Sequence, residues 1–391
     1  MRMSAKEKPV PWQPRAEMDI KREFVELALQ EGANRRDLCR RFGISPKTGY
    51  ALLTRHAQEG AASFTPRSTR PVHSPARTAA PMEQLVVALR REHPSWGGRK
   101  IARRLSDLGH RDVPTPSTVT AILHRHGLIT SQASLAAQHW HRFEHDAPNA
   151  LWQIDFKGDF DTARARCYPL TLLDDHSRFN LALHACANVA TASVQPHLTQ
   201  AFQRYGLPLR INADNGAPWG SPRLPAGSLS ELGVWLVRLG IRITHSAPYH
   251  PQTNGKIERF HRSLKAELLS GHGFADLPQA QCAFERWRTL YNHQRPHDAL
   301  GLQTPAKRYQ LSPRRWPSSL PPIEYPSQDT VAMVKWNGEV RLHGHHLHVS
   351  NALLKLPIAF RADPEHDGCF DAFFCHHHLM RVDLNALNTN P

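Results

Sequence analysis

No apolar run in this 391-residue sequence approaches the roughly 20 consecutive apolar residues that a membrane helix needs. Cysteine is scarce as well: the six cysteines are thinly spread and no two are spaced as CxxC, which is typical of a reducing compartment. The stretch 1–14 is polar and charged and lacks the apolar segment of a signal peptide. These absences predict a cytoplasmic protein with no membrane partner.

Acidic residues are outnumbered by basic ones, 34 to 49, so the net charge is +15. The excess is concentrated in residues 1–130, which hold 23 Lys and Arg against 12 Asp and Glu, a surplus of +11. A polyanion is the natural partner of such a region. A solubilising surface charge would leave the same composition, and charge alone does not decide between them.

Residues 1–60 are predicted to form a helix-turn-helix DNA-binding domain. Three short helices are expected between 19 and 59, with a tight turn at Gly43. Ser45 is a good N-cap and Pro46 a good first residue for the third helix. In this motif the third helix enters the major groove, although a plain helical bundle would show the same helices. Its expected DNA-facing residues are Lys47, Thr48 and Tyr50.

A second domain of similar design is predicted at 82–130, after a basic linker at 61–81 that is rich in Ala, Ser and Pro. Thr115 and Pro116 repeat the cap and first-turn pattern, so we expect a second helix-turn-helix, of winged-helix-like type. Its candidate groove-side residues are Ser117, Thr118 and Arg125.

From residue 145 the pattern changes to strands, so the chain is predicted to be multidomain. Three consecutive strands followed by alternating helices and strands predict an α/β core at 145–307, with a five-stranded mixed sheet. A Pro/Ser-rich linker is expected at 308–328, and short strands at 329–385 predict a small all-β barrel. The His-rich stretch in that last region lacks the ligand spacing of a zinc finger, which favours a solvated surface.

Three carboxylates occupy unusual places in the α/β core. Asp155 lies inside the strand WQIDF, Asp214 ends the fourth expected strand, and Glu258 lies early in a helix. A carboxylate in an apolar strand is costly unless it is neutralised, and carboxylate oxygens suit Mg²⁺ or Mn²⁺. If the first and fourth strands are neighbours, the three could hold two ions about 3.5–4 Å apart, the clamp used for in-line phosphoryl displacement.

The segments WQIDF, LDDHSRF, ADNG, HSAPYHPQTNGKIERFHRSLKAEL and YNHQRPHDALGLQTPA carry a resemblance to a known family. They resemble the integrase-type DDE catalytic core of bacterial insertion-sequence transposases, relatives of retroviral integrases with a ribonuclease-H-like fold. The resemblance covers about 145–310. It implies that Asp155, Asp214 and Glu258 are both the catalytic residues and the ligands of two Mg²⁺ or Mn²⁺ ions.

The sequence departs from that family in two ways. The interval of 43 residues between Asp214 and Glu258 is longer than is typical, and we expect the excess in the loop 217–228. The His-His-Cys-Cys zinc module of retroviral integrases is missing, and helix-turn-helix units stand in its place. That difference indicates a bacterial element, with a protein that is nucleoid-associated when bound to DNA.

The resemblance implies a DNA transposase that cleaves the ends of an insertion sequence and joins them to target DNA. Its partners would be the element's terminal inverted repeats, the target DNA and further copies of the chain, as a homodimer or higher oligomer on DNA. Arg262 and Lys265 share a helical face with Glu258 and are expected to hold phosphates, unless Arg262 pairs with Glu258. Asp174 and Asp175 are interpreted as structural. A domesticated, inactive DNA-binding regulator and a simple nuclease are the alternatives.

Overall fold

The computed structural model describes residues 17–66, 77–129, 145–220, 228–245 and 255–388. They form two compact units, Met1–Arg77 and Thr78–Pro391, each considered by itself below. Three expected features lie partly outside the described residues: the linker 61–81, at 67–76; the long loop, at 221–227; and the HPQTNG motif, at 250–254. None of the described helices has the length and apolar character needed to cross a membrane.

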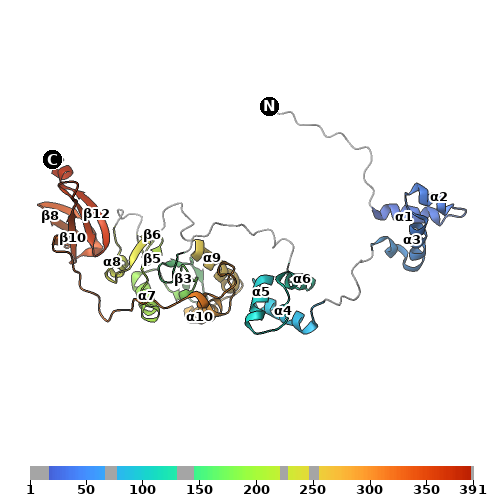
Figure 1. Cartoon of the computed structure of the whole chain (residues 1–391), viewed down its shortest axis with the longest axis horizontal. Helices are drawn as coiled ribbons and strands as arrows, with labels where there is room; N and C mark the ends of the chain where they lie inside the picture. Colours follow the sequence, from blue (N-terminus) through green and yellow to red (C-terminus); the bar gives the residue numbers. More distant parts are fainter. Residues whose placement is uncertain (1–16, 67–76, 130–144, 221–227, 246–254, 389–391) are drawn as a thin grey trace, which may run out of the picture. The chain divides into compact units, whose positions relative to one another are not determined.

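The first unit contains the three expected helices, which gather in one group (Figure 1). They are α1 (Glu17–Ala28), α2 (Arg35–Arg41) and α3 (Pro46–Glu59), followed by a 3₁₀ turn at Gly60–Phe64. The backbone at Gly43 has φ +64°, which suits the glycine of the turn between α2 and α3. Gly49 of α3 is packed so closely that a Cβ would lie 2.5 Å from the Cys39 sulfur. This contact brings α3 tightly onto α2.

A second helical group, α4 (Ala80–Glu92), α5 (Gly98–Asp107) and α6 (Pro116–Arg125), begins the other unit. Its core holds Trp96, Ile101 and Val119, all fully buried. Gly98 permits close packing of α5 on α6, because a Cβ there would lie 2.5 Å from the Pro116 carbonyl oxygen. Residues 77–129 contain helices and no strands, so the wing of a winged helix is not among the described residues.

The α/β core contains one mixed sheet of six strands, one more than expected. The strands are β1 (Trp152–Phe156), β2 (Phe160–Asp161), β3 (Arg166–Asp174), β4 (Asn180–Cys186), β5 (Arg210–Ala213) and β6 (Arg242–His245). Their order is β2-β3-β1-β5-β6, with β4 also paired to β3. The β1–β3 and β3–β4 pairs are antiparallel, whereas β1–β5 and β5–β6 are parallel. The expected change from antiparallel to parallel pairing is therefore confirmed.

Helices cover the sheet in two apolar clusters. The first cluster joins α7 (Thr191–Tyr205) and α8 (Glu231–Arg238) to sheet residues that include Trp152 and Ile154. The second joins α9 (Gly255–Leu264), a π-helical turn (Lys265–Leu269) and α10 (Leu277–His293) to Leu173 and Leu183. Because successive strand residues point to opposite faces, each cluster takes alternate side chains of the sheet.

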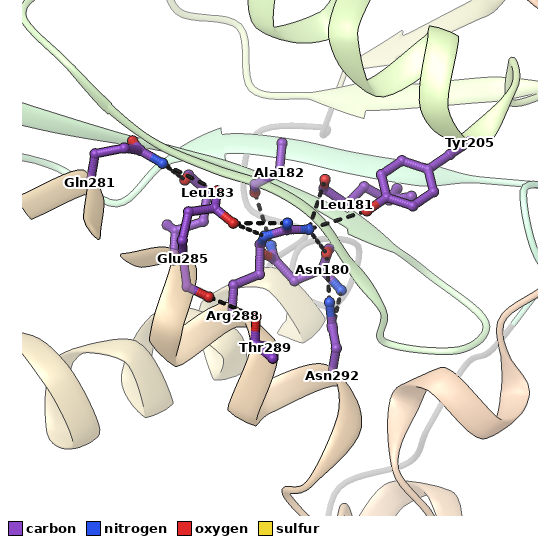
Figure 2. Close-up of polar contacts among 10 residues, drawn as sticks. All are labelled: Asn180, Leu181, Ala182, Leu183, Tyr205, Gln281, Glu285, Arg288, Thr289 and Asn292. Carbon is purple, nitrogen blue, oxygen red and sulfur yellow. Dashed lines mark hydrogen bonds and ion pairs between the residues drawn. The ribbon is translucent and has the colours of Figure 1, made fainter. Parts of the chain in front are cut away.

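Polar side chains of α10 hold that helix against β4 (Figure 2). Asn292 exchanges two hydrogen bonds with the backbone of Asn180, at 2.8 and 2.9 Å. Arg288 donates to the Tyr205 hydroxyl oxygen at 3.2 Å and pairs with Glu285 at 2.9 Å. The Asn of the YNHQRPH motif is thus part of the internal structure of the core.

The segment expected as a linker at 308–328 begins against the α/β core. It follows the short helix α11 (Pro305–Arg308), and the side chains of Trp316 and Leu320 pack on the first apolar cluster. Arg314 donates from Nη2 to the carbonyl oxygens of Leu239 and Gly240, both at 3.0 Å. This part of the segment is therefore packed rather than free.

The C-terminal region is all-β apart from short helical turns. Its strands are β7 (Thr330–Met333), β8 (Glu339–Leu342), β9 (His345–His348), β10 (Pro357–Ala362), β11 (Cys369–Phe374) and β12 (His377–Asp383), followed by α12 (Leu384–Asn388). One sheet has the order β12-β11-β10-β7 and the other is the β8–β9 hairpin. Neither sheet closes on itself among the described residues, so the expected barrel is not confirmed.

Candidate active site

Parallel pairing of β1 with β5 sets two of the three candidate carboxylates side by side. In this register Trp152 pairs with Ile211 and Gln153 with Asn212. Two residues further along, Asp155 lies inside β1 and Asp214 directly follows β5, so continuation of this register would set them at equivalent positions. Neighbouring strands lie about 4.8 Å apart, so the two carboxylates share one edge of the sheet.

Glu258 comes to the same edge on α9. Ile257, Phe260 and Leu264 bury one face of this helix in the second apolar cluster, while Glu258 remains exposed. Helix α9 also contacts β1 through His261, whose Nδ1 lies 3.9 Å from Asp155 Oδ2. The helix that carries Glu258 is therefore packed against the strand that carries Asp155.

The electrostatics of Asp155 depend on the other two candidate carboxylates. The pKa of Asp155 is raised to about 7, first by burial, then by the negative charge of Asp214 and to a smaller extent by that of Glu258. Burial disfavours the charged form of a carboxylic acid, and like charges add to that effect. The site therefore holds excess negative charge that a cation would relieve.

The chemistry of this donor set fits a divalent metal ion, because hard carboxylate oxygens are the ligands that Mg²⁺ and Mn²⁺ prefer. Among the residues that the structure describes, however, no three Asp, Glu, His or Cys side chains are grouped tightly enough to hold an ion as they stand. Metal binding by these three carboxylates therefore stays a prediction.

His261 is a site residue that sequence reasoning missed. Thr171 Oγ1 donates to the backbone oxygen of Asp155 at 2.8 Å, so the 2.8 Å contact between that hydroxyl and His261 Nε2 requires Nε2 to carry the proton. Burial lowers the pKa of His261 to about 3, which keeps the ring neutral. Its unprotonated Nδ1 then faces Asp155. The signal available was its position three residues after Glu258, on the same helical face.

Asp174 and Asp175 both bond to protein groups. Asp174 accepts from the backbone nitrogens of Asn149 and Ser177, both at 2.7 Å. Asp175 accepts from Gln153 Nε2 at 2.9 Å and pairs with Lys256. Their contacts agree with the structural role that we expected for them.

The candidate DNA-facing residues of the first unit lie at the exposed start of α3. Ser45 caps the helix by accepting from Thr48 N at 3.1 Å, which confirms the expected cap. Lys47, Thr48 and Tyr50 are all exposed, and Tyr50 keeps 44% of its surface. Their contact with DNA stays a prediction.

The candidates of the second helical group have different surroundings. Thr115 caps α6, Ser117 is exposed and Thr118 is half-buried. Arg125 pairs with Glu83, whose own residue surface is only 5% exposed. Arg125 would have to contact DNA while holding this ion pair or after releasing it.

Arg262 and Lys265 are exposed, as is Glu258. The side chains of Arg262 and Glu258 are both described, and no ion pair joins them, so the structure does not contain the alternative salt bridge between these two residues. Lys265 opens the π-helical turn Lys265–Leu269, which changes its angular spacing from the α-helical value assumed for a shared face. Phosphate binding by either residue stays a prediction.

Comparison with known families now adds to this geometry. Residues 145–251 and 239–305 each match a family described as "Integrase core domain". Residues 20–71 match a helix-turn-helix domain, and residues 48–123 match a homeodomain-like domain. Residues 145–305 are therefore similar to integrase core domains, and the region before them is similar to helix-turn-helix and homeodomain-like domains.

Similar proteins occur in bacterial insertion elements and in retroviruses. An uncharacterized 31.7 kDa protein of insertion element IS407 from Burkholderia multivorans is 29% identical over 161 residues, 41% of this chain and 55% of that protein. An uncharacterized 39.2 kDa protein of IS476 from Xanthomonas euvesicatoria is 31% identical over 160 residues, 41% of this chain and 44% of that protein. The chain thus spans about half the length of these curated relatives.

Solved structures show a looser likeness. The HTLV-2 integrase catalytic core domain, solved in complex with magnesium, is 19% identical with a TM-score of 0.33, covering 42% of this chain and 99% of that one. A chain of the simian T-cell lymphotropic virus intasome is 20% identical with a TM-score of 0.37, covering 72% of this chain and 98% of that one. At these scores the likeness carries no conclusion about the present site.

The raised pKa of Asp155 makes stability depend on pH in a defined direction. Between an ordinary carboxyl pKa near 4 and the folded value of about 7, the unfolded chain has released its proton and the folded chain keeps it. Stability is therefore lost as pH rises through this window. Asp155→Asn cannot acquire the charge. It should raise the free energy of unfolding of the metal-free protein at pH 8 by on the order of 1 kcal/mol or more, since one pKa unit corresponds to about 1.4 kcal/mol.

Urea unfolding in a chelating buffer at pH 5 and pH 8 measures this effect, which should be smaller at pH 5. Asp161→Asn, an exposed carboxylate at the end of β2, is the control and should show no such gain at either pH. A gain for Asp155→Asn that is equal at both pH values would contradict the prediction.

Proposed function

We propose that the protein is a DNA transposase that cleaves the ends of an insertion sequence and joins them to target DNA. The observation that carries the proposal is the placement of Asp155, Asp214 and Glu258. Strands β1 and β5 pair in parallel, with Asp155 inside β1 and Asp214 directly after β5, and the charges of Asp214 and Glu258 both raise the pKa of Asp155. The integrase core and the helix-turn-helix domains support the same reading. Polynucleotidyl transfer is the reaction class that a cluster of this kind serves.

In this proposal Asp155, Asp214 and Glu258 hold two Mg²⁺ or Mn²⁺ ions. When bound, such ions activate the attacking hydroxyl or water and stabilise the leaving oxygen in an in-line displacement. The carboxylates act as ligands rather than as proton carriers. Neutral His261 faces Asp155 and adds no positive charge to compete with a bound cation. Arg262 and Lys265 would hold phosphates of the DNA end.

The helix-turn-helix domains would recognise the terminal inverted repeats. The exposed start of α3 offers Lys47, Thr48 and Tyr50 to the major groove, and α6 offers Ser117, Thr118 and Arg125. The charge surplus of residues 1–130 suits the phosphate backbone. We retain 1–60, 82–130, 145–307 and 329–385 as the proposed domains.

A DNA-binding regulator without catalysis is the second candidate, because it needs the same recognition helices. It has no use for a strained carboxylate cluster, and the raised pKa of Asp155 therefore favours the enzyme. A simple nuclease would use the cluster but not the tandem recognition domains. Strand joining separates the enzyme from both alternatives.

Asp155→Asn, Asp214→Asn and Glu258→Gln should each abolish strand transfer, because each replaces a charged ligand of a shared cluster with a neutral side chain of similar size. The measurement is joining of a labelled element-end duplex to plasmid DNA with Mg²⁺. Asp161→Asn is the matched control and should keep wild-type joining. All four variants should bind the end duplex normally, and near wild-type joining by any of the first three would overturn the ligand assignment.

Lys47→Ala in the full chain should weaken binding to element-end DNA and lower the slope of log affinity against log salt by about one, because one phosphate contact is lost. Titration of the end duplex at several salt concentrations gives both values. Lys21→Ala removes the same charge from α1, where Lys21 already pairs with Glu17 at 2.6 Å. An equal change of slope in the two variants would show that only net charge had been measured.

We further propose that the active form is a dimer or larger oligomer assembled on DNA, because an element has two ends that must be cut and joined to target DNA in a coordinated way. A chain with Asp155→Asn should be rescued by a catalytically intact chain that lacks residues 1–77, which form a separate compact unit. The first chain supplies end recognition and the second supplies the carboxylates. Cleavage by the mixture, measured against each chain alone, checks the idea, and an inactive mixture would favour a strictly cis-acting enzyme.

A further inference from the structure

A buried polar cluster joins β1, the turn after β3 and the first turn of α9. Gln153 is 1% exposed and Asp175 is 2% exposed. Gln153 donates from Nε2 to Asp175 Oδ1 at 2.9 Å and accepts at Oε1 from the backbone nitrogen of Ile257 at 3.1 Å. Lys256 completes the cluster through its ion pair with Asp175. Three elements that are far apart in sequence are thus fixed to one another at one point.

The Gln153 side chain has a single orientation in this cluster. A backbone N–H can only donate and a carboxylate can only accept, so the amide oxygen must face Ile257 and the amide nitrogen must face Asp175. Ile257 lies in the first turn of α9, where backbone N–H groups have no acceptor within the helix. Gln153 therefore caps α9 from a neighbouring strand.

The position of Lys256 in the first turn of α9 is electrostatically unfavourable for the helix. A positive charge in the first turn opposes the helix dipole, which favours negative charge there. The Lys256 side chain is nevertheless only 16% exposed and points to Asp175, so the cost at the helix end is offset by a specific partner. Asp175 in turn brings a negative charge to the end of α9 where the dipole favours it.

The cluster adjoins both sides of the candidate active site. Gln153 lies two residues before Asp155 on β1, and Ile257 immediately precedes Glu258 on α9. The Gln153–Ile257 hydrogen bond therefore connects β1, which carries Asp155, to α9, which carries Glu258. Asp175 also accepts from His145 N at 3.1 Å, so the backbone that leads into the α/β core bonds to the same carboxylate.

We propose that Asp175 is a positioning residue which, with Gln153 and Lys256, sets Glu258 against Asp155. This inference rests on the proposed function, because it gives the carboxylate cluster a device for assembly. No three ligands are yet grouped for a metal ion among the described residues. The position of the first turn of α9 therefore decides whether Glu258 can join the other two.

Three variants of the full-length protein test the cluster: Gln153→Met, Asp175→Asn and Lys256→Met. Each keeps a similar side-chain volume: Gln153→Met removes both hydrogen bonds of the amide, and each of the other two removes one charge of the ion pair. The first readout is amide hydrogen exchange at Ile257 in metal-free protein, which should become several-fold faster in Gln153→Met and detectably faster in the other two. The second is the dissociation constant for Mn²⁺ alone, measured calorimetrically, which should rise roughly tenfold, as is usual when support of metal ligands is lost.

Asp329→Asn is the matched control. Asp329 is also a carboxylate with a fully buried side chain, and it pairs with Arg361 at 2.9 Å outside the α/β core. Its loss should lower stability without altering Ile257 exchange or Mn²⁺ affinity. In addition, Asp175→Asn and Lys256→Met should not add in the double variant, because both act through one ion pair.

Two results would overturn the proposal. One is unchanged amide exchange at Ile257 in Gln153→Met. The other is unchanged Mn²⁺ affinity in Asp175→Asn and Lys256→Met when Asp155→Asn does weaken Mn²⁺ binding. Lys256→Met keeps the test valid if a buried substitution prevents folding, since that side chain lies at the helix start. A different result would contradict the proposed function: Asp155→Asn would then bind Mn²⁺ as well as the wild-type protein does. Amide exchange at Ile257 is measured without metal, so it still tests the positioning cluster if the proposed function proves wrong.

Discussion

The parallel register between β1 and β5 is the constraint on which the candidate site depends. It places Asp155 and Asp214 at equivalent positions, and it does so only while Trp152 and Ile154 face the first apolar cluster. Side chains alternate along a strand, so Gln153 and Asp155 then face α9 together. A slip of one residue would turn Trp152 away from the first apolar cluster and turn Asp155 into it. Burial of these large side chains therefore also holds the carboxylates in place.

That arrangement stores unfavourable electrostatic energy at the sheet edge. Burial and the charges of Asp214 and Glu258 raise the pKa of Asp155 to about 7, so the folded state resists its full ionisation. Apolar packing supplies the opposing stability, with Trp152, Phe202 and Phe260 all almost fully buried. Binding of a cation at these carboxylates would relieve the repulsion.

Local signals predicted much of this structure, and contacts between distant residues account for what was missed. Ser45 and Thr115 cap their helices as their sequence positions indicate, because a cap involves residues only three apart. The pairing of Arg125 with Glu83 joins residues 42 apart, and the Gln153–Ile257 bond joins residues 104 apart. The hydrophobic periodicity of the sequence does not predict such contacts. The π-helical turn at Lys265 was likewise invisible, since its hydrophobic pattern continues that of α9.

The turn between β3 and β4 connects these observations, because it holds the two helices that cover one face of the sheet. Asp174 closes the turn on itself through Ser177, Asp175 binds the start of α9, and Asn180 binds Asn292 of α10. Each of these side chains is almost fully buried, and a buried polar group left without its partner costs about 1–3 kcal/mol. The turn can therefore hold each helix in only one position at low energy. The acidic pair Asp174–Asp175 thus fixes the frame around the candidate site, and its carboxylates are already used in bonds to protein groups.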